Sequence, residues 1–112
     1  MNMLTRVQAR IPNIDGDLAK ELIKTASDRI LLKVGTGQTV FPVELESIAV
    51  EVVVAMYNRH KMRNEGVQSE SADAFSVSFI KELLKEYEEE FANYRKLYER
   101  QQDVNRGKVR FL

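Results

Sequence analysis

Apolar residues recur every three or four positions along most of the chain, which is the spacing of an amphipathic α-helix. The clearest early example covers about residues 15–34, where one face carries Leu18, Leu22, Ile23, Ala26, Ile30 and Val34. Asp15 suits the start of this helix, because its carboxylate can accept hydrogen bonds from free backbone N–H groups. Gly35 suits its end, because glycine adopts the left-handed conformation that terminates helices.

The segment from Pro42 to about residue 63 is apolar on most sides. One face carries Leu45, Ile48, Ala49, Val52, Met56 and His60, and further apolar residues widen it: Val50, Val53, Val54 and Tyr57. Proline is tolerated in the first turn of a helix, so Pro42 is expected to open it. The valines also favour a strand, but the segment is long and does not alternate. We therefore expect a helix that is buried on most sides.

Two further helices complete the expected fold. Residues 3–11 predict a short helix that ends before Pro12, since the residue preceding proline disfavours helical geometry. Residues 80–102 predict a long last helix with a charged outer face and an apolar stripe formed by Ile80, Leu83, Leu84, Tyr87, Phe91, Tyr94, Leu97 and Tyr98. The expected fold class is all-α, a small helical bundle of three to four helices.

The pattern changes before the last helix and again after it. Residues 64–71 are polar, and in residues 72–79 small or polar side chains alternate with Phe75, Val77 and Phe79. Alternation with period two predicts a short strand or an extended arm. After Gly107, the apolar and basic tail either folds back on its own core or docks on a neighbour. We expect one domain over 1–112, with a short helix in 1–12, a loop and arm in 64–79 and a tail in 103–112.

Composition and charge exclude several classes of function. Seventeen basic residues balance seventeen acidic ones, which gives no support to a nucleic-acid binder. The chain has no cysteine, so disulfide frameworks, cysteine zinc sites and thiol nucleophiles are excluded. The sequence shows no signal peptide, and its most apolar run is about half the ~20 residues that span a bilayer. We expect a protein that is cytoplasmic where it is made.

Candidate chemistry is sparse. His60 is the only histidine and has no evident catalytic or metal-binding partner, and Gly35-Thr36-Gly37 lacks the spacing of a phosphate-binding loop. Glu88, Glu89 and Glu90 are expected on a solvated face. The tyrosines and phenylalanine of the last helix are expected in the core, with partner contact as the second interpretation. No catalytic, cofactor-binding or metal site is expected.

Three motifs in order resemble a known family. They are Ala55-Met-Tyr-Asn-Arg59, then Asn64-Glu-Gly66 with Ser69-Glu-Ser71, then Phe75-Ser-Val-Ser-Phe79. Together they are similar to the head–tail connector proteins of long-tailed bacteriophages and prophages. The motifs Phe41-Pro-Val-Glu-Leu45 and Gly107-Lys-Val-Arg-Phe-Leu112 add to the resemblance, which covers about residues 15–112.

The resemblance implies a structural subunit of the virion without enzymatic activity. It implies a ring of about twelve or thirteen copies beneath the portal protein. That ring would extend the channel through which DNA passes and would carry the next head-completion or tail protein. The candidate interface residues toward ring neighbours or the next component are Glu65, Gly66, Ser69, Glu70, Ser71, Phe75, Val77 and Phe79. The candidates toward the portal are Val109, Arg110, Phe111 and Leu112.

Two alternatives remain open. A small helical DNA-binding regulator would need basic residues on a recognition helix, and the nearby basic cluster is Arg59-His-Lys-Met-Arg63 at a helix end. A generic helical interaction module of another bacterial complex is the second alternative.

Overall fold

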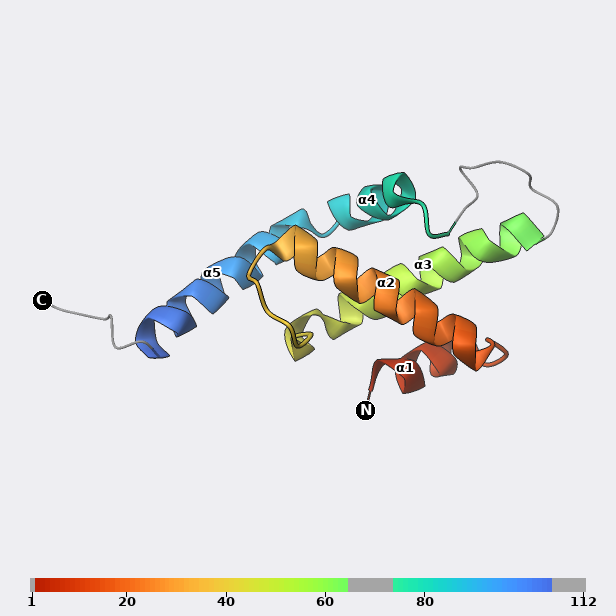
Figure 1. The fold of residues 1–112 in the computed structure, drawn as a ribbon, viewed down its shortest axis with the longest axis horizontal. Coiled ribbons are helices and arrows are strands. Elements are labelled where there is room, and N and C mark those ends of the chain that lie inside the picture. Colours follow the sequence, from red (N-terminus) through yellow and green to blue (C-terminus); the bar gives the residue numbers. More distant parts are fainter. Residues whose placement is uncertain (1, 65–73, 106–112) are drawn as a thin grey trace, which may run out of the picture.

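The computed structural model describes residues 2–64 and 74–105, and within them the chain is helical throughout apart from short connections (Figure 1). The prediction of an all-α helical bundle is confirmed. The described part contains five α-helices instead of three to four, together with one 3₁₀ turn. In chain order the elements are α1 (Met3–Arg10), α2 (Gly16–Val34), η1 (Val43–Leu45), α3 (Glu46–Asn64), α4 (Val77–Lys85) and α5 (Glu88–Asn105).

Helix α2 begins and ends where the sequence predicts. The backbone N–H of Leu18 donates to a carboxylate oxygen of Asp15 at 2.9 Å, which satisfies one of the free donors of the first turn. At the other end Gly35 adopts φ 74°, and its N–H donates to the carbonyl of Leu31 at 2.9 Å. A residue with a Cβ would be strained at this φ, so glycine is the residue suited to this position.

Helix α3 is the centre of the bundle. Pro42 precedes the 3₁₀ turn η1, which leads directly into α3. Helices α1, α2 and α4 all contact α3, and Figure 1 shows α2 and α3 running past one another with α1 beneath them. Val50, Val52 and Val53 are all buried, although they point to different sides of the helix. The prediction of a helix buried on most sides is confirmed.

One core cluster joins all five α-helices. Helix α1 contributes Val7 to this cluster, and the turn after it contributes Ile14. The guanidinium of Arg6 in α1 also donates a 2.7 Å hydrogen bond to the hydroxyl of Ser47 in α3. Fully buried alanines in α2 and α3 leave room for close helix packing. The buried members are Val7, Ile14, Ala19, Leu22, Ala26, Ile30, Val34, Leu45, Ile48, Ala49, Val50, Val52, Val53, Met56, Ala74, Ile80, Leu84, Phe91 and Tyr94.

The predicted strand or arm before the last helix is wrong in its described part. Val77 and Phe79 lie in the first turn of α4, and the backbone N–H of Phe79 donates to the hydroxyl of Ser76 at 3.3 Å. Serine is a preferred helix N-cap for this reason. The alternation over five residues is therefore a cap followed by one helical turn. Residues 65–73, which hold most of the predicted loop, lie outside the described residues.

The predicted last helix is divided into α4 and α5. The N–H of Tyr87 bonds the carbonyl of Leu84, three residues back, and the regular four-residue pattern resumes when the N–H of Phe91 bonds the carbonyl of Tyr87. A tight turn of this kind changes the helix direction with little change in which side chains face the core. The apolar stripe therefore crosses the break. The first turn of α5 is formed by Glu88, Glu89 and Glu90. Their carboxylates stabilise the helix there, because they lie near the positive end of its dipole.

The second half of α5 projects past the ends of α2 and α3 (Figure 1). Leu97 lies in this half of α5, and although the stripe predicted it to be inward, it is 52% exposed. Tyr98 is only partly buried against the core. Helix α5 continues to Asn105, so the first residues of the predicted 103–112 tail are helical. Residues 106–112 lie outside the described part.

Candidate assembly interfaces

The structure places three of the twelve candidate interface residues. Phe75 and Val77 are exposed on either side of the Ser76 cap at the start of α4. Phe79 is partly buried and packs against the core. The remaining candidates lie outside the described residues: Glu65, Gly66, Ser69, Glu70, Ser71, Val109, Arg110, Phe111 and Leu112. Two of the predicted contact residues thus form an exposed apolar pair beside the 65–73 segment.

Arg59 of α3 lies over the ring of Phe79, with its guanidinium carbon 4.1 Å from the ring centroid. An arginine at this distance is attracted by the ring face, and the pair ties the end of α3 to the start of α4. Arg59 is also the first residue of the basic cluster that a DNA-binding regulator would use. Its guanidinium is engaged inside the fold, which weakens that alternative.

A groove of about 380 Å³ runs between α2 and α4. Ile80 and Leu84 of α4 form its apolar floor, and Leu32 of α2 stands at its edge, 73% exposed. Leu32 lies outside the apolar stripe of α2. The position of Leu32 is one sign of the groove in the sequence, because an aliphatic residue off the buried stripe of a helix is left facing solvent.

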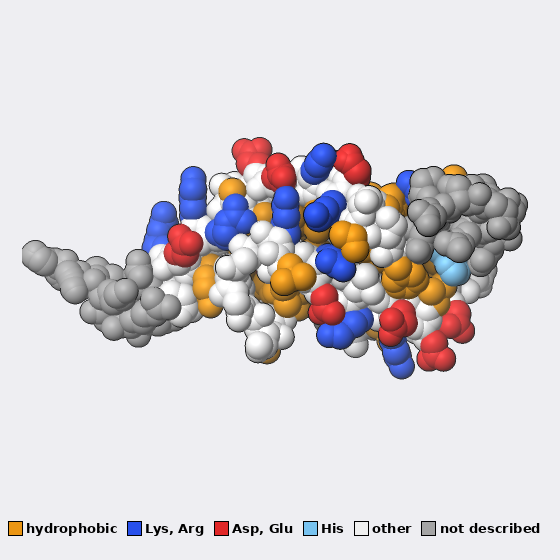
Figure 2. All heavy atoms as spheres, turned by 45° about the horizontal axis from the view of Figure 1, so that its top comes forward, with side chains coloured by type: hydrophobic (Ala, Val, Ile, Leu, Met, Phe, Trp, Pro, Cys, Tyr) orange, Lys and Arg blue, Asp and Glu red, His pale blue; other side chains and the backbone are white. Residues whose placement is uncertain are grey.

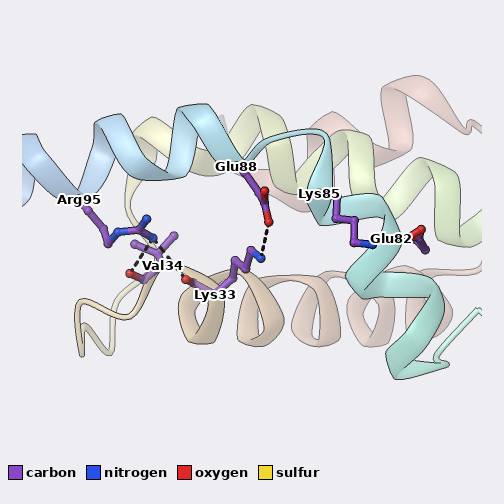
Figure 3. Close-up of polar contacts among 6 residues, drawn as sticks. All are labelled: Lys33, Val34, Glu82, Lys85, Glu88 and Arg95. Atoms are coloured by element: carbon purple, nitrogen blue, oxygen red, sulfur yellow. Dashed lines mark hydrogen bonds and ion pairs between the residues drawn. The ribbon is translucent and has the colours of Figure 1, made fainter.

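Basic side chains surround this groove. Its lining includes Arg29 and Lys33 from α2 and Lys81 and Lys85 from α4. Figure 2 shows Lys and Arg side chains on this face of the molecule, with Asp and Glu side chains among them. Lys33 pairs with Glu88 at 2.9 Å and Lys85 with Glu82 at 3.2 Å (Figure 3). Within the described residues, Arg29 and Lys81 have no acidic partner, so the groove keeps an excess of positive charge.

The end of α2 is held to α5 by polar contacts (Figure 3). Arg95 points its guanidinium at the carbonyls of Lys33 and Val34, at 3.5 and 3.4 Å. A cation there suits the negative end of the α2 dipole and two carbonyls that lack helical partners. On the same side, the hydrogen bond from Lys33 lowers the pKa of the Glu88 carboxyl. These contacts hold the first half of α5 against the end of α2.

The aromatic stripe of α5 belongs mainly to the core. Phe91 and Tyr94 are buried, and Tyr87 and Tyr98 pack against the core. The hydroxyl of Tyr94 donates to the side-chain oxygen of Gln38 at 3.0 Å. The interpretation of these rings as core residues is confirmed. Beyond Tyr94, a second groove lies between α5 and the start of α3, with Leu97 and Tyr98 on one side and Glu44 and Ile48 on the other.

Tyr87 is expected to make stability depend on alkaline pH. Burial, together with its 2.7 Å hydrogen bond to Glu51, raises the pKa of Tyr87 to about 12. The protonated phenol therefore stabilises the fold fully below pH 10, and this contribution is lost between pH 10 and about 12. Tyr87→Phe should cost about 1 kcal/mol at neutral pH, a small value because the pair is partly solvated.

The measurement is urea unfolding of both proteins at several pH values. The stability difference between wild type and Tyr87→Phe should shrink above pH 10. A difference that stays constant to pH 12 would show that the phenol does not ionise with a shifted pKa. Ultraviolet titration of tyrosinate formation gives an independent check.

The described residues hold little that resembles a reactive centre. No group of three His, Asp or Glu side chains among them could hold a metal ion. Glu88, Glu89 and Glu90 are all exposed, and His60 is partly buried near the end of α3. The segment from Gly35 to Gly37 follows a helix and has positive φ at both glycines, as in an ordinary loop. None of the described helices is long and apolar enough to cross a membrane.

Comparison with known families gives a match over most of the chain. The model of the phage gp6-like head-tail connector proteins matches residues 1–95, which includes all of α1 to α4 and the start of α5. Searches of curated proteins and of solved structures gave no match. The five-helix fold and the exposed grooves agree with a structural assembly role, and so does the resemblance seen in the sequence motifs. The chain belongs to the phage gp6-like head-tail connector family.

Proposed function

We propose that this protein is a subunit of a closed ring beneath the portal of a long-tailed phage or prophage. The ring extends the DNA channel and joins the head to the next head-completion or tail protein. The family match over residues 1–95 carries the proposal. On this proposal the protein has no enzymatic activity and no cofactor, and its copies assemble in the host cytoplasm before they become part of the virion.

The surface of the subunit supports this role. A ring requires a heterologous contact, in which one surface of each copy meets a different surface of the next. Two apolar grooves and the exposed Phe75 and Val77 lie on separate parts of the molecule. A subunit with several distinct exposed apolar surfaces can contact ring neighbours and axial partners at once.

The charge balance is compatible with a conduit for DNA. The chain has seventeen acidic and seventeen basic residues, so it does not bind the passing phosphates through a large net charge. The basic cluster near the end of α3 uses Arg59 internally, in its contact with Phe79. DNA is therefore cargo in this proposal, and gel-shift assays at physiological salt should show no stable complex with duplex DNA.

Light scattering over a wide concentration range, followed by electron microscopy, tests the ring. We expect closed rings of about twelve or thirteen copies, formed by the protein alone or on addition of its portal. A dimer that persists on dilution would contradict the proposal, and so would a monomer that fails to join the portal. Tight duplex binding in the gel shift would favour a DNA-binding regulator instead.

A further inference from the structure

We propose that the groove between α2 and α4 receives residues 65–73 of a neighbouring copy. This docking depends on the ring proposed above and names the two surfaces that would meet in it. The groove is described by the structure, and the occupant is identified by its sequence and charge. Because each copy carries both parts at different places, the contact is heterologous and can repeat around a ring.

The groove has the form of a protein docking site. Its floor is apolar, since Ile80 and Leu84 line it, and Leu32 at its edge is 73% exposed. A single exposed leucine is ordinary, but here the leucine borders a hollow of about 380 Å³. Covering Leu32 would remove apolar surface from water at about 25 cal/mol per Å². An occupant therefore needs at least one small apolar side chain.

The rim specifies an acidic occupant. Arg29 and Lys81 have no acidic partner among the described residues, while Lys33 and Lys85 are each paired with one glutamate. The groove thus has four cations and two nearby carboxylates. Complementary charge guides association and fixes register. An approaching segment with carboxylates and no cation would pair with Arg29 and Lys81 without displacing the existing ion pairs.

Residues 65–73 have this composition. They contain the carboxylates of Glu65, Glu70 and Asp73, have no lysine or arginine, and include the apolar residue Val67. The other segment outside the described residues, 106–112, is the opposite case, since it carries Arg106, Lys108 and Arg110. A basic tail would be repelled by the groove. Charge therefore selects 65–73 over the tail as the occupant.

The positions of the two parts allow contact between copies. Residues 65–73 connect the end of α3 to the start of α4, whereas the groove is lined by Ile80, Lys81, Leu84 and Lys85, farther along α4. Nine residues span at most about 30 Å when fully extended. Because both ends of this segment join helices of the same subunit, a loop that goes out and returns reaches at most about 15 Å, which is enough to contact a neighbour packed beside it.

Charge reversal tests the groove. Arg29→Glu with Lys81→Glu should raise the concentration needed for ring formation roughly tenfold or more, because two attractions become repulsions. Adding Glu70→Lys and Asp73→Lys to the same chain should restore assembly. Lys96→Glu with Arg100→Glu is the matched control, because both residues are exposed on α5 and neither lines the groove. Circular dichroism of each variant checks that the helices are intact.

Cross-linking tests the occupant, and the chain is suited to it because it has no cysteine. One preparation carries Leu32→Cys and the other Ser69→Cys. When they are mixed under ring-forming conditions and oxidised, we expect a disulfide-linked dimer of the two chains. Val40→Cys replaces Leu32→Cys in the control, because Val40 is 77% exposed and lies outside the groove.

The outcomes separate this docking from the ring itself. Two results together would overturn the docking and leave the ring in place. The chain with Arg29→Glu and Lys81→Glu would form rings normally, and rings that contain Leu32→Cys and Ser69→Cys chains would give no cross-link. Failure of the unmodified chain to form rings, even with its portal, would remove both proposals. A third preparation carries Leu32→Cys and Ser69→Cys in the same chain. If a disulfide forms within this chain and the mixed single-cysteine chains give none, the docking is overturned, because the segment then occupies its own groove.

Discussion

Replacing Phe91 by alanine should lower the free energy of unfolding by about 3–5 kcal/mol, the usual cost of removing a buried phenylalanine ring. Phe91 is 1% exposed and anchors the first half of α5 to the core. The loss combines the transfer of the ring to water with the cavity that remains. For a domain whose total stability is typically about 5–15 kcal/mol, the change is a large fraction.

Leu97→Ala is the control on the same helix. Leu97 is half exposed, so its truncation should cost well under 1 kcal/mol. Urea unfolding followed by circular dichroism gives both values. Equal costs at the two positions would show that α5 does not pack on the core through Phe91.

Val53→Asp should prevent folding at ordinary temperature. Val53 is fully buried in α3, and none of the buried residues that the structure describes is polar or charged. A buried carboxylate without a partner must either take up a proton or draw water into the core, at a cost above about 4 kcal/mol. The expected spectrum is that of a largely unfolded chain, with no cooperative thermal transition.

Val43→Asp makes the same chemical change at a solvated site. Val43 is exposed in the 3₁₀ turn before α3, so its variant should fold with a stability within about 0.5 kcal/mol of wild type. Val53→Thr separates polarity from charge, because its hydroxyl can bond a backbone carbonyl within the helix. A folded and stable Val53→Asp protein would contradict the central position of α3.

The sequence predicts the helices whose signals agree with one another. In α2 the apolar stripe, the Asp15 cap and the Gly35 stop all indicate the same boundaries, and the structure has them there. In α3, the length of the apolar run outweighs the strand preference of its valines. In both segments the local signals and the pattern of burial favour a helix, so tertiary packing did not have to override a local preference.

The start of α4 and its break from α5 could not be predicted in the same way. Five alternating residues fit a strand and a capped helical turn equally well, and the choice depends on Phe79 and Ile80 packing against helices far away in the sequence. A tight turn at Tyr87 preserves the apolar stripe, so periodicity does not reveal it. Leu97 continues the apolar stripe of α5 but is half exposed, in the half of the helix that projects past α2 and α3.

The grooves depend on which helices pack side by side, and a single sequence does not show which helices these are. Leu32 lies far from Ile80 in the chain, yet both line the groove between α2 and α4. The sequence indicated contact regions at 64–79 and at the tail, and of these the structure describes Phe75, Val77 and Phe79. The basic groove was missed because its cations come from two helices, with neither helix strongly basic alone.

The Ser76 cap has an evolutionary consequence. Because Ser76 supplies its own hydrogen bonds to the first turn, α4 starts without help from the residues before it. Doubling the length of a loop between two helices costs only about 0.6 kcal/mol in closure entropy. Insertions and deletions between Asn64 and Ala74 can therefore accumulate while the bundle stays intact.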